Sequence, residues 1–448
     1  MNRLLVILMT SLALALSGCL GGGGGPSSNL PAPEGPTAQV RVLHASAGAP
    51  NVDIYVNGDL GIPNLPFGEG TAFIPLPASA LEIDIRAAGA AADSDPVFST
   101  VVTPTEGDFF TLVAYGVIGS QATPLDLLVI PDQIQTPADG FTRLFVLHGA
   151  PAVGPVDVYT NTGDDLAATP TVQNFLPGTD TSDYLEIPEG TYRIRITPTG
   201  SSEVAYDSGE LTLGGGLSYF AAALDRPSGI APASVVALVG DPAFVALEDN
   251  RVQIRAVHLA PDAPQVEVLV NGAGTGVELA FTEFSDYLVV QAGTYDLAVA
   301  IPGTTTPVAG QVFTLEAEAG QSYSALATGL LTPATAAQDF TLRGLADDTT
   351  PASGNDVKVR VIHAAPDAPN VDVLANGAIL QPLENVPYFT ASSYLTVPAG
   401  NYDLEVNVTG TTDTVIDLPA TALSAGSIYT VIATDVLPAP LTPVLIVD

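Results

Sequence analysis

The stretch Val359–Gly377 reads VRVIHAAPDAPNVDVLANG, and its pattern occurs three more times in the chain. It occurs as VRVLHASAGAPNVDIYVNG from Val40, as LFVLHGAPAVGPVDVYTN from Leu144 and as IRAVHLAPDAPQVEVLVNG from Ile254. The four histidines of the chain occupy the same position in the four segments: His44, His148, His258 and His363. Their separations of 104, 110 and 105 residues indicate four tandem copies of one unit.

Each copy has the pattern of an all-β unit. Valine alternates with basic residues in Val357–Val361 (VKVRV), which is typical of a strand with one apolar face. Proline and glycine interrupt such runs every ~8–12 residues, the spacing of strands in a β-sandwich. In VPAGNY, Pro398 and Gly400 suit a tight turn between antiparallel strands. We therefore predict an all-β chain with four tandem immunoglobulin-like antiparallel β-sandwich domains, over residues 37–136, 139–247, 250–346 and 356–448.

The N-terminus has the pattern of an export signal. In residues 1–18, Arg3 precedes the apolar run LLVILMTSLALAL, which is shorter than the ~20 residues of a permanent spanning helix. Leu16–Cys19 (LSGC) resembles the lipobox of bacterial lipoproteins. This resemblance implies cleavage of the signal peptide and lipidation of Cys19, the only cysteine, and Leu20 resembles the residue found there in the outer-membrane-directed form. Residues 19–36 are rich in Gly, Pro and Ser and read as a flexible tether. We expect an exported protein that its lipid anchors to the cell envelope, with the outer membrane favoured over the inner.

The charge of the chain excludes one class of partner. The sequence has 48 acidic and 12 basic residues, with a net charge of −36, and Lys358 is its only lysine. A chain so poor in cations cannot neutralise phosphates by releasing their counterions. We therefore exclude nucleic acid as a partner and expect a partner that is not anionic, such as a glycan or another surface protein.

Three blocks of the fourth copy support a family resemblance. VRVIHAAPDAPNVDVLANG, the downstream SSYLTVPAGNYDLEV from Ser392 and the later IYTVIAT together resemble the bacterial domain-of-unknown-function 4397 family. The first and third copies match this pattern well, and the second departs from it at Gly154 and Pro155. The resemblance implies exported, often lipid-anchored proteins with β-sandwich repeats, and it implies no enzymatic activity.

An acidic residue follows each histidine by nine positions: Asp53, Asp157, Glu267 and Asp372. An imidazole and a carboxylate can share a metal ion or a proton. Strand alternation argues against such a pair, because His363 shares a face with the valines of its strand, whereas Asp372 lies between two inward-facing valines. We therefore interpret the histidines as core residues bonded to nearby backbone, and we predict no catalytic, cofactor-binding or metal-binding residue.

Other acidic residues leave two interpretations open. Asp262 and Asp367 lie between prolines in the loop APDAP, where they are candidates for a ligand-binding loop or simply accept bonds from local backbone amides. We favour the second interpretation. Acids also gather near the junctions between copies, where they could bind calcium or be solvated linker charge, and we favour solvation. These junction residues are Asp132, Asp139, Glu248, Asp249, Asp347, Asp348 and Asp356.

Common enzyme motifs are absent from the sequence. It has no G-x-S-x-G, no H-E-x-x-H and no phosphate-binding loop. We expect a non-catalytic envelope protein whose repeated modules serve as binding or spacer units, with an adhesion or interaction role. Two alternatives remain: an extracytoplasmic glycoside hydrolase that uses paired carboxylates, and a structural spacer stiffened by calcium.

Overall fold

The computed structural model describes residues 28–448 except 92, 118–120, 122, 133–134, 164–165, 167–168, 179–183, 226–232, 240–243, 248, 353–354 and 439. The predicted signal peptide and Cys19 therefore lie outside the described residues. The chain forms two compact units, one of Met1–Arg226 with Ala231–Asp249 and one of Pro227–Ile230 with Asn250–Asp448. No helix in the described part of the chain has the length and apolar character needed to cross a membrane.

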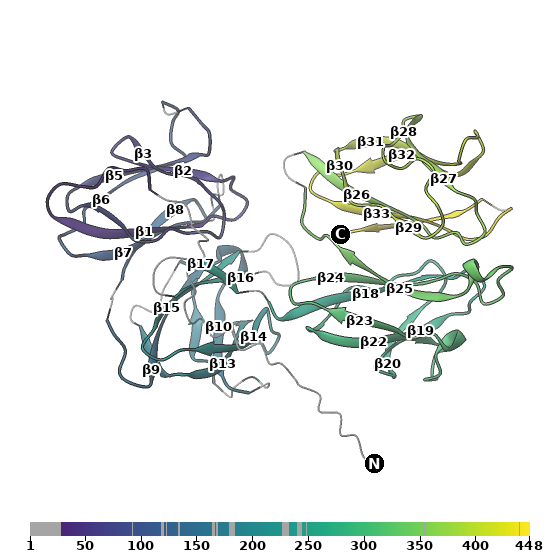
Figure 1. Cartoon of the computed structure of the whole chain (residues 1–448), viewed down its shortest axis with the longest axis horizontal. Coiled ribbons are helices and arrows are strands. Elements are labelled where there is room, and N and C mark those ends of the chain that lie inside the picture. Colours follow the sequence, from purple (N-terminus) through teal and green to yellow (C-terminus); the bar gives the residue numbers. More distant parts are fainter. Residues whose placement is uncertain are drawn as a thin grey trace, which may run out of the picture. The chain divides into compact units, whose positions relative to one another are not determined.

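The first unit begins with a sandwich of two four-stranded sheets, ordered β4-β1-β7-β8 and β3-β2-β5-β6 (Figure 1). Its strands are β1 (Thr37–Ala45), β2 (Val52–Val56), β3 (Asp59–Leu65), β4 (Ile74–Pro77), β5 (Leu81–Ala87), β6 (Phe98–Val102), β7 (Phe109–Tyr115) and β8 (Asp126–Pro131).

The second sandwich completes the first unit, with sheet orders β12-β9-β15-β16-β17 and β11-β10-β13-β14. Its elements are β9 (Phe141–Gly149), the 3-10 turn η1 (Pro151–Val153), β10 (Val156–Asn161), β11 (Val172–Phe175), β12 (Leu185–Pro188), β13 (Gly190–Pro198), β14 (Tyr206–Leu213), β15 (Ser218–Asp225), β16 (Ala233–Val239) and β17 (Phe244–Leu247).

The third sandwich begins the second unit, with sheet orders β21-β18-β24-β25 and β20-β19-β22-β23. Its elements are β18 (Arg251–Leu259), β19 (Val266–Val270), β20 (Ala273–Leu279), β21 (Leu288–Gln291), β22 (Gly293–Ala300), η2 (Val308–Gly310), β23 (Phe313–Ala317), β24 (Ser322–Thr328), η3 (Ala336–Gln338) and β25 (Thr341–Asp347).

The fourth sandwich has sheet orders β29-β26-β33-β34, with β30 also paired to β26, and β28-β27-β31-β32. Its strands are β26 (Asp356–His363), β27 (Val371–Ala375), β28 (Ala378–Ile379), β29 (Thr390–Ala391), β30 (Leu395–Pro398), β31 (Gly400–Val408), β32 (Thr414–Leu423), β33 (Ile428–Thr434) and β34 (Thr442–Val447). The prediction of an all-β chain with four β-sandwich repeats is confirmed.

The expectation of purely antiparallel sandwiches is wrong for one pairing in each copy. β1 runs parallel to β7, and the same holds for β9 with β15, β18 with β24, and β26 with β33. Turn signals such as Pro and Gly determine the direction of consecutive strands only. Between β1 and β7 the chain passes twice through the opposite sheet, so no local signal in the sequence sets their relative direction.

The first strand of each copy is buried on both faces. In β1, Val40 and Val42 point into the core between the two sheets of their own sandwich. Leu43 and Ala45, which lie on the other face, pack in one cluster with Phe145 and Phe220 of the second sandwich. In the second unit a corresponding cluster contains Val257, Leu259 and Leu326 of the third sandwich together with Ile362, Ala364 and Ile432 of the fourth. Each unit is therefore a face-to-face pair of sandwiches.

Candidate functional site

The repeated histidines are buried and bonded to backbone on both ring nitrogens. His44 is typical: its Nε2 lies 3.2 Å from the carbonyl oxygen of Pro50, and its Nδ1 accepts from the N–H of Ser46 at 3.4 Å. The other three copies repeat both contacts, through the carbonyls of Gly154, Pro264 and Pro369 and the amides of Ala150, Ala260 and Ala365. Because Nδ1 accepts, the proton belongs on Nε2, and burial lowers the pKa of all four imidazoles.

The acids nine positions later join two turns of their own sandwich. Asp53 accepts from the N–H groups of Asn64 at 2.7 Å and Gly89 at 3.0 Å, and both donors have left-handed backbone, with φ of 51° and 76°. The other copies use Asn174 and Gly200 for Asp157, Gly276 and Gly303 for Glu267, and Asn385 and Gly410 for Asp372. The bonds from Asn385 and Gly410 lower the pKa of Asp372. The histidine and the acid thus bond different segments of backbone and do not form a shared site.

The acids of the APDAP loops bond across to another loop. Asp262 accepts from the N–H groups of Leu331 and Thr332, at 2.8 and 2.9 Å, and from the Thr332 hydroxyl. Asp367 accepts from the N–H of Leu437 at 3.0 Å. The donors lie some 70 residues downstream, so these carboxylates fix a distant loop and not their own turn.

Two junction acids are buried in ion pairs, and the prediction that they are solvated is wrong. In the first unit, Asp132 pairs with Arg41 at 2.8 Å and accepts from the hydroxyls of Thr111, at 2.5 Å, and of Tyr184, at 2.8 Å. Tyr184 belongs to the second sandwich, so Asp132 joins the two sandwiches of the unit. Burial, with the nearby Asp132 carboxylate, raises the pKa of Tyr184.

The second unit has a larger cluster of the same kind. Asp347 lies 2.6 Å from Arg360 of the fourth sandwich and 3.6 Å from Arg255 of the third, and it accepts from the Tyr287 hydroxyl at 2.8 Å. Arg255 also makes a bidentate contact with Asp448, at 2.7 and 3.0 Å. Sequence reasoning missed this cluster. An arginine three positions before the histidine, in three of the four copies, was the available signal.

The remaining junction acids differ from one another. Asp348 pairs with Lys358 at 2.5 Å and Asp249 is buried, so the solvated interpretation is wrong for Asp249 too. Asp139 is exposed, Asp356 is half-buried, and Glu248 lies outside the described residues. Within the described part of the chain, no group of three or more His, Cys, Asp or Glu side chains is placed to hold a metal ion.

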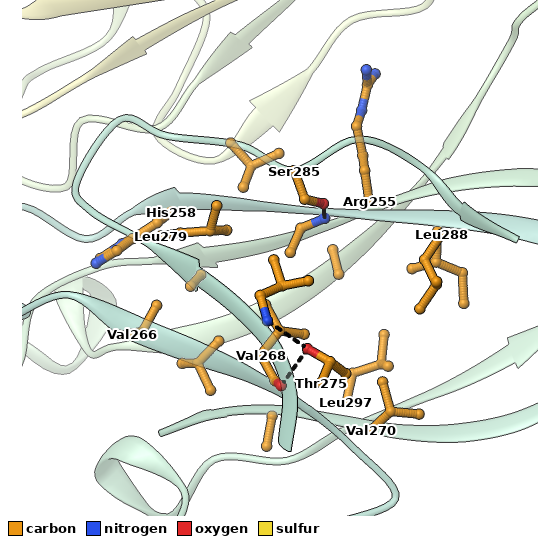
Figure 2. A pocket seen from close by; sticks show the side chains of 18 of the residues that line it. Arg255, His258, Val266, Val268, Val270, Thr275, Leu279, Ser285, Leu288 and Leu297 are labelled. Carbon is orange, nitrogen blue, oxygen red and sulfur yellow. Dashed lines mark hydrogen bonds between the residues drawn. The ribbon is translucent and has the colours of Figure 1, made fainter. Parts of the chain in front are cut away.

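An apolar slot is a further candidate for binding. It lies inside the third sandwich, has a volume of about 70 Å³ and is lined in part by Leu288, whose residue is 48% exposed. Figure 2 shows Leu288 and Arg255 on the slot, with the Arg255 side chain directed away from it. The lining is almost entirely aliphatic and includes Val268, Val270, Val277, Val290 and Leu297.

These features define a class of protein: tandem pairs of β-sandwiches in which the repeated polar side chains form hydrogen bonds with the backbone of their own sandwich. The chain belongs to the family described as domain of unknown function DUF4397, which matches residues 38–159, 146–268, 252–374 and 357–448. The first three matches each run past their own sandwich into the first two strands of the next, and successive matches overlap.

No curated protein sequence matches the chain. Two solved structures resemble it in part. The Bacillus anthracis TIE protein is 10% identical, with a TM-score of 0.16 and coverage of 92% of this chain and 73% of that one. A putative cell adhesion protein from Bacteroides uniformis is 13% identical, with a TM-score of 0.18 and coverage of 47% of this chain and 99% of that one. At these TM-scores neither protein bears on the function of this chain.

Proposed function

We propose that the chain is an exported, lipid-anchored protein of the cell envelope whose β-sandwiches act as binding or spacer modules and not as a catalyst. One observation carries this proposal. Two polar side chains recur in all four copies, the histidine and the acid nine positions later. Both form hydrogen bonds with the backbone of their own sandwich. Their recurrence therefore reflects folding of the module, and binding falls to surfaces that differ among the copies.

The cations of the chain support a partner that is not anionic. Arg41, Arg255 and Arg360 lie in buried ion pairs, and the only lysine, Lys358, is paired with Asp348. The chain has a net charge of −36, and these paired cations are not free on the surface to attract an anionic partner. Such a surface repels phosphate-rich partners and is compatible with a neutral glycan or a surface protein that carries basic residues.

Lipid anchorage is tested by replacing Cys19. The variant Cys19→Ser should lose the mass of the acyl chains and leave the membrane fraction, because several acyl chains are what give stable anchoring. Ser28→Ala, in the tether, is the matched control and should stay in the membrane fraction. Membrane retention of Cys19→Ser at the wild-type level would contradict lipid anchorage.

The non-catalytic role is tested by incubating the intact protein with a panel of polysaccharides and measuring new reducing ends. We expect none above the background of a heat-unfolded sample. Turnover that a carboxylate substitution abolishes would establish the hydrolase alternative instead. A large rise in melting temperature with millimolar calcium, reversed by a chelator, would establish the calcium-stiffened spacer.

A further inference from the structure

The strands β19 and β20, which line part of the slot in the third sandwich, correspond to β2 and β3 of the first sandwich. The two copies align without gaps from His44 and His258 onward, with a constant offset of 214 residues, and the strand registers agree with this alignment. Ile62, which is 3% exposed in the core of the first sandwich, aligns with Gly276 on β20. Gly276 is itself exposed and does not line the slot, whereas Val268 and Val277, which do line it, are only partly buried.

In the first sandwich a separate segment also covers this edge. Asn29 donates its N–H to the carbonyl oxygen of Gly61 on β3 at 2.8 Å, and Leu30 packs against the core of the sandwich. The Leu30 side chain lies so close to Gly61 that a Cβ built there would be 3.2 Å from its Cδ1. A short segment thus bonds to the edge strand and packs one partly buried leucine against the core.

The fourth sandwich closes the same edge with its own loop. Leu383 is 3% exposed in the core, and its carbonyl accepts from the N–H of Val373 on β27 at 2.9 Å. Leu380 donates its N–H to the carbonyl of Val373 at 2.8 Å and packs on the same core. In the second sandwich the cavity between the sheets is smaller, about 30 Å³. The cavity between the sheets of the third sandwich is therefore larger than that of the second, at an edge where the first and fourth sandwiches each place a leucine against the core.

The size and charge of the slot restrict what can occupy it. Small-molecule sites usually have volumes of ~300–1,000 Å³, so about 70 Å³ suits a single aliphatic side chain and not a cofactor or a lipid chain. β20 and β21 are the edge strands of their sheets, which can accept an added strand. Asp286 lines the slot and Glu278 lies on β20, both exposed, so the rim favours a positively charged partner.

We propose that the open edge of the third sandwich binds an extended peptide segment of a partner protein, which lies along β20, inserts one leucine-sized side chain into the slot and places basic residues beside Asp286 and Glu278. The inference rests on the proposed interaction role and names its partner class. The bound peptide occupies the place that the Asn29–Leu30 segment has in the first sandwich.

The test is a fluorescence-anisotropy titration of the full-length chain in detergent with a labelled peptide, acetyl-KSNLPAK-amide, which surrounds the Asn29–Leu30 sequence with lysines. We expect saturable binding that weakens about tenfold or more when the peptide leucine is replaced by alanine. Replacing both peptide lysines by glutamates should also weaken binding. This loss of affinity should be larger at low salt than at high salt.

Two matched variants locate the peptide. Leu288→Asp places a charge in the slot and should weaken binding about tenfold or more, whereas Val289→Asp, on the other face of the same strand and 42% exposed, should change it less than about twofold. Because both residues are exposed at an edge strand, both variants should keep the wild-type melting temperature. Equal binding by the two variants, or binding that ignores the peptide leucine, overturns the proposal.

Two further outcomes separate this inference from others. A concentration-dependent dimer that Leu30→Asp and Leu288→Asp both abolish would assign the slot to a second copy of the chain and overturn the partner proposal. A flat peptide titration overturns the docking site while leaving lipid anchorage and the absence of turnover as they are. Polysaccharide turnover would overturn the proposed function and leave the peptide result standing.

Discussion

The interfaces inside the two units use the same sheets with different contacts. In the first unit one arginine, Arg41, pairs with Asp132, and the second sandwich contributes an aromatic stack in which the rings of Phe145 and Phe220 lie 5.2 Å apart. In the second unit both sandwiches contribute an arginine, and Arg255 and Arg360 share Asp347. Phe145 stands where the other three copies have arginine. One sheet pairing therefore tolerates an ionic or an aromatic residue at this position, provided that each buried arginine retains an acid.

The largest effect is expected from Asp347→Ala. This substitution leaves Arg360 without its closest carboxylate and Arg255 with Asp448 alone, and breaking a buried ion pair in this way costs about 3–5 kcal/mol. The chain has no tryptophan, so the loss is measured by denaturant-dependent hydrogen exchange, peptide by peptide. We expect lower protection in the second unit and unchanged protection in the first.

Asp348→Ala is the control for this variant. Its carboxylate is 42% exposed and pairs with Lys358, so its removal should cost at most ~1 kcal/mol. Equal losses for the two variants would show that the buried position of Asp347 adds nothing to the stability of the interface.

Asp132→Ala should cost less, about 3 kcal/mol, because Asp132 pairs with one arginine, whereas Asp347 contacts two. The apolar stack of Phe145 and Phe220 remains and continues to hold the two sandwiches together. Asp139→Ala, an exposed junction acid, is the control and should leave protection unchanged. The comparison between the units breaks if Asp132→Ala destabilises its unit more than Asp347→Ala destabilises the other.

The sequence predicts those parts of the fold that depend on local alternation. The VKVRV run and the histidine column identify the first strand and its inward face, since both follow from side chains alternating along one strand. The opposite face is not solvent-exposed throughout, because Ile362 on that face lies at the interface with the third sandwich. Whether that face is covered depends on a second sandwich about 100 residues away in sequence, so alternation alone cannot reveal it.

The same reasoning explains what was missed at the site. The burial of Asp132 and Asp347 depends on arginines brought from another strand, and the slot depends on side chains that two separate sheets bring together. A signal for the slot existed, because β20 reads AGTGVEL where β3 reads DLGIPNL. It becomes interpretable only once both strands are known to lie at the same edge.

The pH dependence should be alike in the two units despite their different interfaces. Burial lowers the pKa of every histidine below its ordinary 6.5, so the unfolded chain binds more protons as the pH falls below that value. The free energy of unfolding should therefore be constant above about pH 7.5 and decline below pH 6.5. Each histidine contributes a decline of up to about 1.4 kcal/mol per pH unit, which ends once the pH falls below the lowered pKa of the folded state.

Each unit contains two histidines, so hydrogen exchange between about pH 7.5 and 5.5, corrected for intrinsic rates, should give both units a loss of stability of at most ~3 kcal/mol. His363→Asn should halve this slope in the second unit and leave it unchanged in the first. A slope of the opposite sign, with stability rising on acidification, would mean that the folded imidazoles are charged.

The smallest effect separates the two sandwiches of the second unit. Asp262 accepts three hydrogen bonds from the loop at Leu331 and Thr332, whereas Asp367 accepts one, from Leu437. Asp262→Ala should therefore lower the protection of its loop by about 1–2 kcal/mol, and Asp367→Ala by about 0.5–1 kcal/mol. Amide exchange at Leu331, Thr332 and Leu437 measures both.

Each carboxylate acts on a loop of its own sandwich, so neither variant should alter protection in the other sandwich. If Asp367→Ala opened its loop as much as Asp262→Ala, the number of accepted bonds would not determine loop stability. The proline-flanked acid would then act in another way, and the ligand-loop interpretation of APDAP, which we did not favour, would become the better explanation of why both copies carry it.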